Sequence, residues 1–259
     1  MPVYERNKTT RIFSTEVVLV DIIDFSCMSV DDQVTATVMI NGELEKYLSI
    51  STGQSAFAIK EVVAGFVPTG DGFYVVLQPR LVGYGLLLAL SLRTMLLMGS
   101  QQCKNLLQGI RIGVHFGEIA PFEDITEKQN FVGPVMNNCA RLLNAKSSQA
   151  PNGFLSDDCF IIASTESVER FKINYKYDDD DSYFKKMGVK ISNYIKVDDK
   201  HGTKHTGAFI EGSRVSAYNP PRPSDFKERV IKRLNRVMPG TGDIKPEELA
   251  LDWPASLFP

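Results

Sequence analysis

Hydrophobic residues in this chain form short continuous runs that alternate with longer segments of helical periodicity. The runs are rich in Val, Ile and Phe and are bounded by Gly, Pro, Asp or Ser, which is typical of buried strands. They predict strands at residues 16–25, 57–67, 73–78, 109–119 and 159–164. Apolar residues at helical spacing predict helices at 29–49, 79–102, 135–147 and 165–171.

The order of these elements predicts the fold. It reads β-α-β-β-α-β-α-β, which gives an α+β protein with a ferredoxin-like βαββαβ core. In that core the first and third strands lie side by side. Segments 188–199 and 207–215 predict a further β-hairpin, and 219–238 predicts a basic amphipathic helix. We therefore expect one domain over 1–215 and a Pro-rich, basic C-terminal segment over 216–259.

One stretch is apolar enough to raise the question of a membrane span. Residues 81–98 approach the length that crosses a bilayer. Arg93 lies inside this stretch, and an Arg at the centre of a membrane helix costs about 3 kcal/mol. A buried helix is therefore the better interpretation, and we expect no stable membrane insertion.

Composition excludes several other classes. The net charge is −2, so the chain lacks the basic excess of a nucleic-acid-binding protein. The four cysteines are widely separated and have no zinc-ligand spacing. The N-terminus lacks the apolar segment of a signal peptide. These features predict a cytoplasmic protein with reduced thiols.

Two carboxylates stand where the hydrophobic pattern predicts strands and a tight hairpin. Asp21 interrupts the apolar run EVVLVDIIDF, where an isolated ionised carboxylate is costly to bury. Asp71 lies at the tip of the hairpin FVPTGDGFYVV, although Asp also suits ordinary turns. Because the first and third strands are expected to be neighbours, the two carboxylates should meet at one sheet edge. Mg²⁺ binds through one or two carboxylates plus substrate phosphates, so this edge is a candidate metal site.

Four blocks of the chain together resemble the catalytic domain of the class III nucleotidyl cyclases. They are VDIIDFSCMS, GFVPTGDGFYVVL, IRIGVHFGEI and NFVGPVMNNCARLL, and they occur in the order and spacing of that family. The resemblance implies that residues 1–215 form a cyclase domain that dimerises head to tail. It also implies conversion of a nucleoside triphosphate to a 3′,5′-cyclic monophosphate and pyrophosphate.

The resemblance assigns roles to individual positions. Asp21 and Asp71 match the metal-binding aspartates, and the carbonyl of Ile22 matches a backbone ligand, which implies two Mg²⁺ or Mn²⁺ ions per site. Asp21 is also a candidate to accept the proton of the 3′-hydroxyl. Asn137 matches the residue that orients the nucleotide, and Arg141 matches the residue that stabilises the transition state. In the family the carboxylates and the Asn/Arg helix come from different subunits, which implies a homodimer with composite sites.

The predicted base pocket departs from the purine cyclases. Adenylate cyclases have a Lys three residues before the hairpin Gly and an Asp three residues before the Gly of the fourth block, whereas guanylate cyclases have a Glu/Cys-type pair. Val67 and Asn130 occupy these positions here. Phe66 is an alternative wall residue if Pro68 shifts the register, and Phe25 is a further candidate for base contact.

An apolar wall and one amide suit a smaller base. In this respect the chain resembles the pyrimidine cyclases of bacterial anti-phage (Pycsar) systems, which implies UTP as substrate and cyclic UMP as a signal. A phosphate-facing Lys is usual in a late loop of the family, and Lys200 and Lys204 are the candidates.

Two alternatives remain open. One is an adenylate or guanylate cyclase with an atypical base pocket, and the other is an inactive cyclase-like nucleotide-binding module. The inactive module is disfavoured because all four matched positions hold competent residue types. The chain also has no P-loop, and its TGDGF hairpin is not the GG[DE]EF signature of a diguanylate cyclase.

Overall fold

The computed structural model describes residues 12–51, 62–81, 83–97, 109–151, 154, 159–198 and 202–212. Its strands are β1 (Phe13–Ile22), β2 (Val63–Pro68), β3 (Gly72–Leu77), β4 (Ile110–Glu123), β5 (Gln129–Val132), β6 (Ile161–Ser164), β7 (Val189–Ile191), β8 (Ile195–Asp198) and β9 (Lys204–Gly212). Its α-helices are α1 (Val30–Ser51), α3 (Tyr84–Leu97), α5 (Pro134–Leu142), α6 (Thr165–Asn174) and α7 (Tyr183–Lys186). Short 3₁₀ helices span Phe25–Cys27 and Ser147–Gln149.

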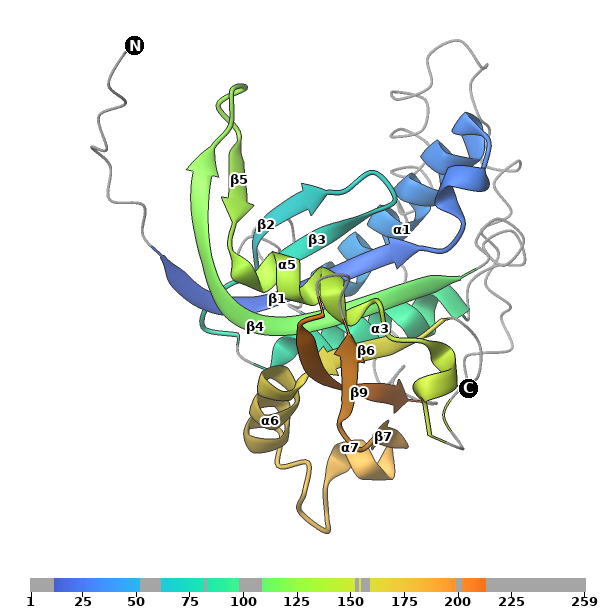
Figure 1. The fold of residues 1–259 in the computed structure, drawn as a ribbon, viewed down its shortest axis with the longest axis vertical. Helices are drawn as coiled ribbons and strands as arrows, with labels where there is room; N and C mark the ends of the chain where they lie inside the picture. Colours follow the sequence, from blue (N-terminus) through green and yellow to red (C-terminus); the bar gives the residue numbers. More distant parts are fainter. Residues whose placement is uncertain are drawn as a thin grey trace.

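A single twisted sheet runs through the described residues in the order β2-β3-β1-β4-β6-β9-β7 (Figure 1). Strands β2-β3-β1-β4, together with α1 and α3, form the predicted ferredoxin-like βαββαβ core. β1 is antiparallel to both β3 and β4, so the first and third predicted strands are neighbours, as expected. β8 and β9 pair antiparallel and form the expected late hairpin.

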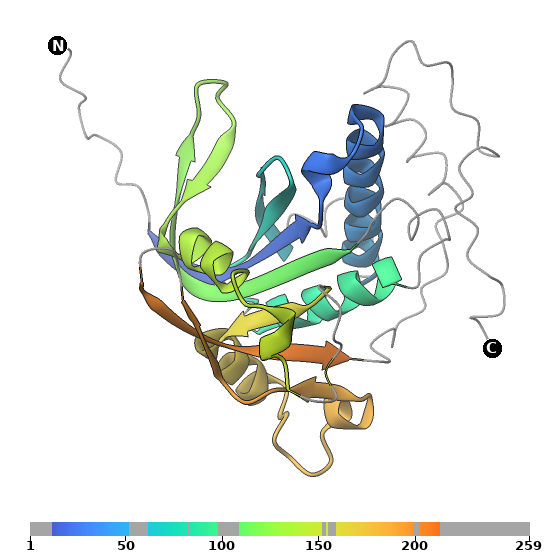
Figure 2. The same cartoon turned by 45° about the vertical axis from the view of Figure 1, so that its right-hand side comes forward.

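Side chains alternate along β1 and divide the core between the two faces of the sheet. Val18 and Val20 belong to the cluster that packs against α1 and α3. Val17 and Leu19 belong to the cluster that packs against α5. Figure 2 shows α5 and α3 on opposite sides of the sheet. Because successive strand residues point to opposite faces, Asp21 shares the α5 face with Leu19.

Several element boundaries differ from the predictions. The helix expected at 79–102 begins at Tyr84, because Gly83 has φ +84°, a left-handed conformation that ends the preceding turn. The strand expected at 109–119 continues to Glu123, because its extension pairs with β5, a strand that was not predicted. α5 ends at Leu142, earlier than expected. The predicted amphipathic helix and the domain boundary after residue 215 lie outside the described residues.

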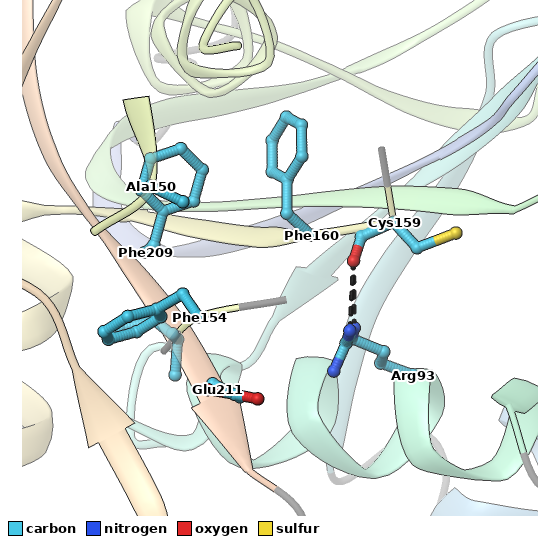
Figure 3. Close-up of a pocket in the computed structure, with 8 residues that line it drawn as sticks. Arg93, Ala150, Phe154, Cys159, Phe160, Phe209 and Glu211 are labelled. Carbon is cyan, nitrogen blue, oxygen red and sulfur yellow. Dashed lines mark hydrogen bonds between the residues drawn. The ribbon is translucent and has the colours of Figure 1, made fainter. Parts of the chain in front are cut away.

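The charged residue inside the apolar stretch, Arg93, is buried and hydrogen-bonded within the protein. Its side chain is 4% exposed, and Nε and Nη2 donate to the carbonyl oxygen of Cys159 at 3.2 and 3.1 Å (Figure 3). A cavity of about 10 Å³ lies beside this contact and is lined in part by Phe160 and Phe209. It holds about one water molecule, so it is too small for a nucleotide. Among the described helices, none is long and apolar enough to cross a membrane.

Glu16 is a carboxylate buried within the fold. Its side chain is 1% exposed, and Oε2 accepts a hydrogen bond from the backbone N–H of Gly85 at 2.8 Å. Oε1 has no hydrogen-bond partner in the described part of the chain. Burial raises the pKa of Glu16 to about 7, and the opposing effects of the Gly85, Ser167 and Gly83 contacts and of the Arg170 charge are smaller. Ionised Glu16 therefore destabilises the native state near neutral pH.

Replacing Glu16 by Gln is expected to raise the free energy of unfolding by up to about 3 kcal/mol at pH 8. A raised folded pKa means that the native state holds the proton more tightly than the unfolded chain. Stability is therefore lost as the pH rises from about 4.3, the unfolded value, through the folded value. The advantage of Glu16→Gln should disappear toward pH 4, as measured by urea unfolding at both pH values.

The control is Glu118→Gln, which changes an exposed carboxylate of β4. It should give a small, pH-independent change. A Glu16→Gln variant that is destabilised equally at both pH values would show that the ionised carboxylate is well satisfied in the native protein.

Candidate active site

The turn between β2 and β3 fixes Asp71 between two glycines that cannot be replaced without strain. Gly70 has φ +100°, in the region that favours glycine. A Cβ on Gly72 would lie 1.9 Å from the carbonyl oxygen of Val20, so β1 and the hairpin could not approach each other as they do. The N–H of Thr69 donates to the Gly72 carbonyl at 3.0 Å and closes the turn. Local backbone geometry thus holds Asp71 beside the end of β1.

Asp21 and Asp71 lie next to each other across the β1–β3 pair. Asp21 is opposite Gly72 in the ladder, and the N–H of Ile22 donates to the carbonyl oxygen of Asp71 at 2.9 Å. Burial raises the pKa of Asp21, Arg111 opposes this increase, and the negative charge of Asp71 adds to it. The two carboxylates therefore interact electrostatically, and a cation between them would relieve the repulsion.

The carboxylate pair has the donor chemistry of a hard-cation site. The Asp71 side chain is exposed, and its Oδ1 accepts a long hydrogen bond of 3.3 Å from the Thr69 hydroxyl. Ile22, whose carbonyl was predicted as a ligand, ends β1 beside both aspartates. Within the described ranges no group of three or more His, Cys, Asp or Glu side chains forms a metal cluster. Two carboxylates that leave positions open for phosphate oxygens and water fit Mg²⁺ or Mn²⁺.

Arg111 is a site residue that the sequence analysis missed. It lies directly opposite Asp21 in the β1–β4 ladder. Both Nε and Nη2 donate to Asp21 Oδ2, at 2.8 and 2.6 Å. An Arg within the otherwise apolar run IRIGV was the available signal, because a charge in a buried strand requires a partner.

The loop that follows β1 is held in a constrained conformation. Asp24 adopts φ +56°, which is uncommon for a residue other than glycine. Gln33 Nε2 donates to the carbonyl oxygens of Phe25 and Met28 at 3.0 and 3.3 Å and ties the loop to α1. The Phe25 side chain packs against the α1/α3 core cluster. It is therefore directed toward the α1/α3 side of the sheet, and its contact with the base stays a prediction.

Val67 and Asn130 are brought to neighbouring strands, whereas Phe66 is not. Val67 pairs with Tyr74 and packs with the α5-side cluster, on the same face as Asp21. Phe66 stacks on Phe73, with ring centroids 4.7 Å apart, and Phe73 belongs to the opposite cluster. The β2–β3 register is regular from Gly65 to Pro68, so Pro68 does not shift the pairing of Phe66. Phe66 therefore lies on the face opposite to Val67 and Asp21, and its contact with the base stays a prediction.

β5 carries Asn130 and is held against β2. The ring of Phe131 lies over Gly65, where a Cβ would come within 1.9 Å of the ring. Asn130 is half-buried, and its Oδ1 accepts from the N–H of Phe131 at 2.8 Å. This bond uses one lone pair of Oδ1, and the Nδ2 hydrogens have no part in it. The residues at positions 67 and 130 are thus one apolar side chain and one amide.

α5 presents Asn137 and Arg141 from a well-anchored helix. Its buried face consists of Val135, Cys139 and Leu142. The Tyr74 hydroxyl donates to the carbonyl oxygen of Met136 at 3.2 Å and joins α5 to β3. Asn137 is exposed and Arg141 is half-buried.

Arg141 Nη1 lies 3.4 Å from Asn138 Oδ1, so the guanidinium rests along the helix. Arg111 and Asp71 are the charged residues that shift the pKa of Asp21. Arg141 of the same copy of the chain does not contribute to this shift.

Two lysines are candidates to bind the phosphates of the nucleotide. Lys204 begins β9 and is exposed. Lys200 lies outside the described residues.

Comparison with solved structures identifies the fold. The chain is similar to the guanylyl cyclase Cya2, with a TM-score of 0.54, 17% identity and coverage of 81% of this chain and 97% of that one. It is also similar to the adenylyl cyclase CyaB from P. aeruginosa, with a TM-score of 0.51, 14% identity and coverage of 79% and 96%. The guanylate cyclase domain of RhGC from Catenaria anguillulae, in complex with GTP, gives a TM-score of 0.50, 17% identity and coverage of 78% and 98%.

No protein-family model matches the sequence, and no curated protein matches it. At identities this low, structural similarity establishes the fold and leaves the activity to be argued from the residues. The chain has the fold of the class III nucleotidyl cyclase catalytic domains.

Proposed function

We propose that this protein is a nucleotidyl cyclase that converts a nucleoside triphosphate to its 3′,5′-cyclic monophosphate and pyrophosphate. The observation that carries the proposal is the β1–β3 register, which places Asp21 beside the hairpin that holds Asp71. This pair lies where β1 ends and β3 begins, in a fold shared with adenylyl and guanylyl cyclases. An inactive binding module would have no need for two adjacent carboxylates that repel each other.

In the proposed reaction Asp21, Asp71 and the carbonyl of Ile22 hold the divalent ions. When bound, these ions lower the pKa of the ribose 3′-hydroxyl and neutralise the triphosphate. Asp21 accepts the hydroxyl proton, and the 3′-oxygen forms a bond to the α-phosphorus as the bond to the pyrophosphate oxygen breaks. Arg141 offsets the negative charge that develops on the α-phosphoryl group, and Asn137 fixes the ribose for in-line attack.

The active site in this proposal is assembled from two copies of the chain. Asn137 lies on the exposed side of α5 rather than in its contact with the sheet. The β4–β5 hairpin projects from the body of the protein (Figure 2) and exposes Phe122, Ile125 and Val132. Exposed apolar side chains on a projecting hairpin favour a covered surface in the functional state, and a second copy supplies that cover.

We further propose UTP as the preferred substrate. Val67 offers no hydrogen-bonding group to a base, and Asn130 Oδ1 already accepts from the N–H of Phe131, which leaves Nδ2 as the donor that we assign to the base. A donor at this position complements the O4 carbonyl of uracil and opposes the amino group of cytosine. Cyclic UMP would then serve as the signal, as in anti-phage pyrimidine cyclases. An adenylate or guanylate cyclase with an unusual pocket is the alternative that the structural neighbours favour.

The purified protein should be incubated with Mn²⁺ and ATP, GTP, CTP or UTP separately, and the products identified by mass. Cyclic UMP should dominate, and Asp71→Asn protein prepared in parallel should form none. Dominant cyclic AMP or cyclic GMP would contradict the pyrimidine proposal and leave the cyclase proposal standing. Absence of any cyclic product from all four nucleotides would contradict both.

A further inference from the structure

Arg111 flanks a carboxylate that the proposed function requires for metal binding. Of the two strands that border β1, β3 places Gly72 opposite Asp21 and β4 places Arg111 there. Gly72 has no side chain, so the only cross-strand side chain opposite Asp21 in these two pairings is the cationic one of Arg111, on β4. In the Asp21–Arg111 ion pair, the Asp21 side chain is 15% exposed and the Arg111 side chain is 38% exposed, so Asp21 is the more buried of the two.

The geometry of this contact limits how Asp21 can bind a metal. Both guanidinium donors converge on Oδ2, at 2.8 and 2.6 Å, and they leave Oδ1 for another ligand. A cation at Asp21 and Asp71 would therefore use one oxygen of Asp21 rather than both. It would also lie within a few ångströms of a full positive charge, where repulsion is substantial at a partly buried site.

Arg111 also stabilises the carboxylate pair when no cation is present. The Arg111 guanidinium lies 2.6 Å from Asp21 Oδ2, so its positive charge offsets part of the negative charge that Asp21 and Asp71 bring together. The role that a divalent ion would have between the carboxylates is thus partly filled by a side chain of the protein itself. A divalent ion gains less by binding than it would at an unpaired Asp–Asp site.

We propose that Arg111 is a built-in competitor of the metal at Asp21, which keeps the affinity for free divalent ions low until a triphosphate contributes its own negative charge. The inference rests on the metal role of Asp21 and Asp71 in the proposed function. Arg111 acts in it as a positioning residue, because it affects the metal through Asp21. Metal occupancy would then depend on the presence of the nucleotide.

The test is Mn²⁺ binding to the full chain without nucleotide, measured by electron paramagnetic resonance. Arg111→Gln should bind Mn²⁺ about tenfold more tightly than the native protein, because one positive charge next to the site is removed. Arg111→Lys keeps the charge and should stay within about twofold of native affinity. With a non-hydrolysable triphosphate present, the difference between native and Arg111→Gln protein should shrink.

Two further variants serve as controls for the Mn²⁺ affinity of Arg111→Gln. Lys190→Gln removes one positive charge from β7, at the opposite edge of the sheet, where Lys190 pairs with Glu211 at 3.6 Å. This charge-matched control should leave Mn²⁺ affinity unchanged. In the double variant Asp21→Asn/Arg111→Gln the gain in affinity should be lost. Circular dichroism and thermal melting verify that each variant is folded.

The outcomes separate this inference from the proposed function. If native protein binds Mn²⁺ through Asp21 and Arg111→Gln binds no more tightly, the competitor role is wrong and the metal site stands. If Arg111→Gln binds more weakly, Arg111 supports the metal rather than competing with it. If neither protein binds Mn²⁺ at millimolar concentration, both the inference and the metal site are contradicted.

Discussion

The Asp71→Asn variant should lose cyclase turnover by about a thousandfold or more while it remains folded. Asn suits the same turn positions as Asp, and the glycine geometry on either side of residue 71 is unaffected. The substitution therefore removes one of two carboxylates from the metal site with little change to the hairpin. The readout is the rate of cyclic product formation with saturating Mn²⁺.

Asp180→Asn is the matched control, because Asp180 is an exposed member of the acidic run 178–181, far along the chain from the hairpin. It should retain native turnover. Circular dichroism and size-exclusion chromatography of both variants separate a loss of chemistry from a loss of fold or assembly. Native turnover in a folded Asp71→Asn protein would remove the hairpin carboxylate from the mechanism.

An equimolar mixture of two inactive variants, Asp71→Asn and Arg141→Ala, should recover about one quarter of native activity. If subunits exchange freely, half of the dimers combine one subunit of each kind. One of the two composite sites in each such dimer then pairs an intact metal site with an intact α5. The activity of the mixture should be measured after the subunits have had time to exchange.

Each variant alone should be reduced by at least about a hundredfold, since one lacks a metal ligand and the other a transition-state cation. Recovery in the mixture, with none in either variant alone, requires that Asp71 and Arg141 act from different subunits. A mixture that stays as inactive as its components would contradict the composite site. Loss of activity on dilution of the native protein is expected for the same reason.

The strands and helices of the core could be predicted because their hydrophobic patterns are strong and local. The run around β1 is apolar on both faces of the sheet, and α1 begins where Ser29 caps the helix, accepting from the N–H of Asp32 at 3.2 Å. The topology followed from element order, and it placed Asp21 next to the hairpin of Asp71 at the ends of neighbouring strands. The proximity of Asp21 and Asp71 could therefore be predicted from the order of neighbouring strands alone.

Features that depend on register between distant strands could not be predicted. β5 is four residues, QNFV, with no alternating pattern, and it forms because the extension of β4 offers it a partner. Arg111 was missed because its position opposite Asp21 depends on the β1–β4 register. The burial of Glu16 depends likewise on how α3 packs against β1, through the N–H of Gly85.

Phe66 and Val67 show that a shift of one residue along a strand changes which side chain faces the candidate site. Adjacent strand positions point to opposite faces, so the sequence left both residues as candidates for base contact. The pairing of Val67 with Tyr74 resolves the ambiguity, because Tyr74 lies on the α5 side of the sheet. A Val67→Lys change would therefore place a charge on the face that carries Asp21, whereas the same change at Phe66 would not.

The most direct measurement is the anomalous diffraction of Mn²⁺ in crystals of the protein grown with a non-hydrolysable nucleoside triphosphate. We predict a manganese peak about 2 Å from carboxylate oxygens of both Asp21 and Asp71, shared with oxygens of the triphosphate. A well-ordered triphosphate with no manganese at these carboxylates, or with manganese held elsewhere on the chain, would contradict the two-aspartate metal site.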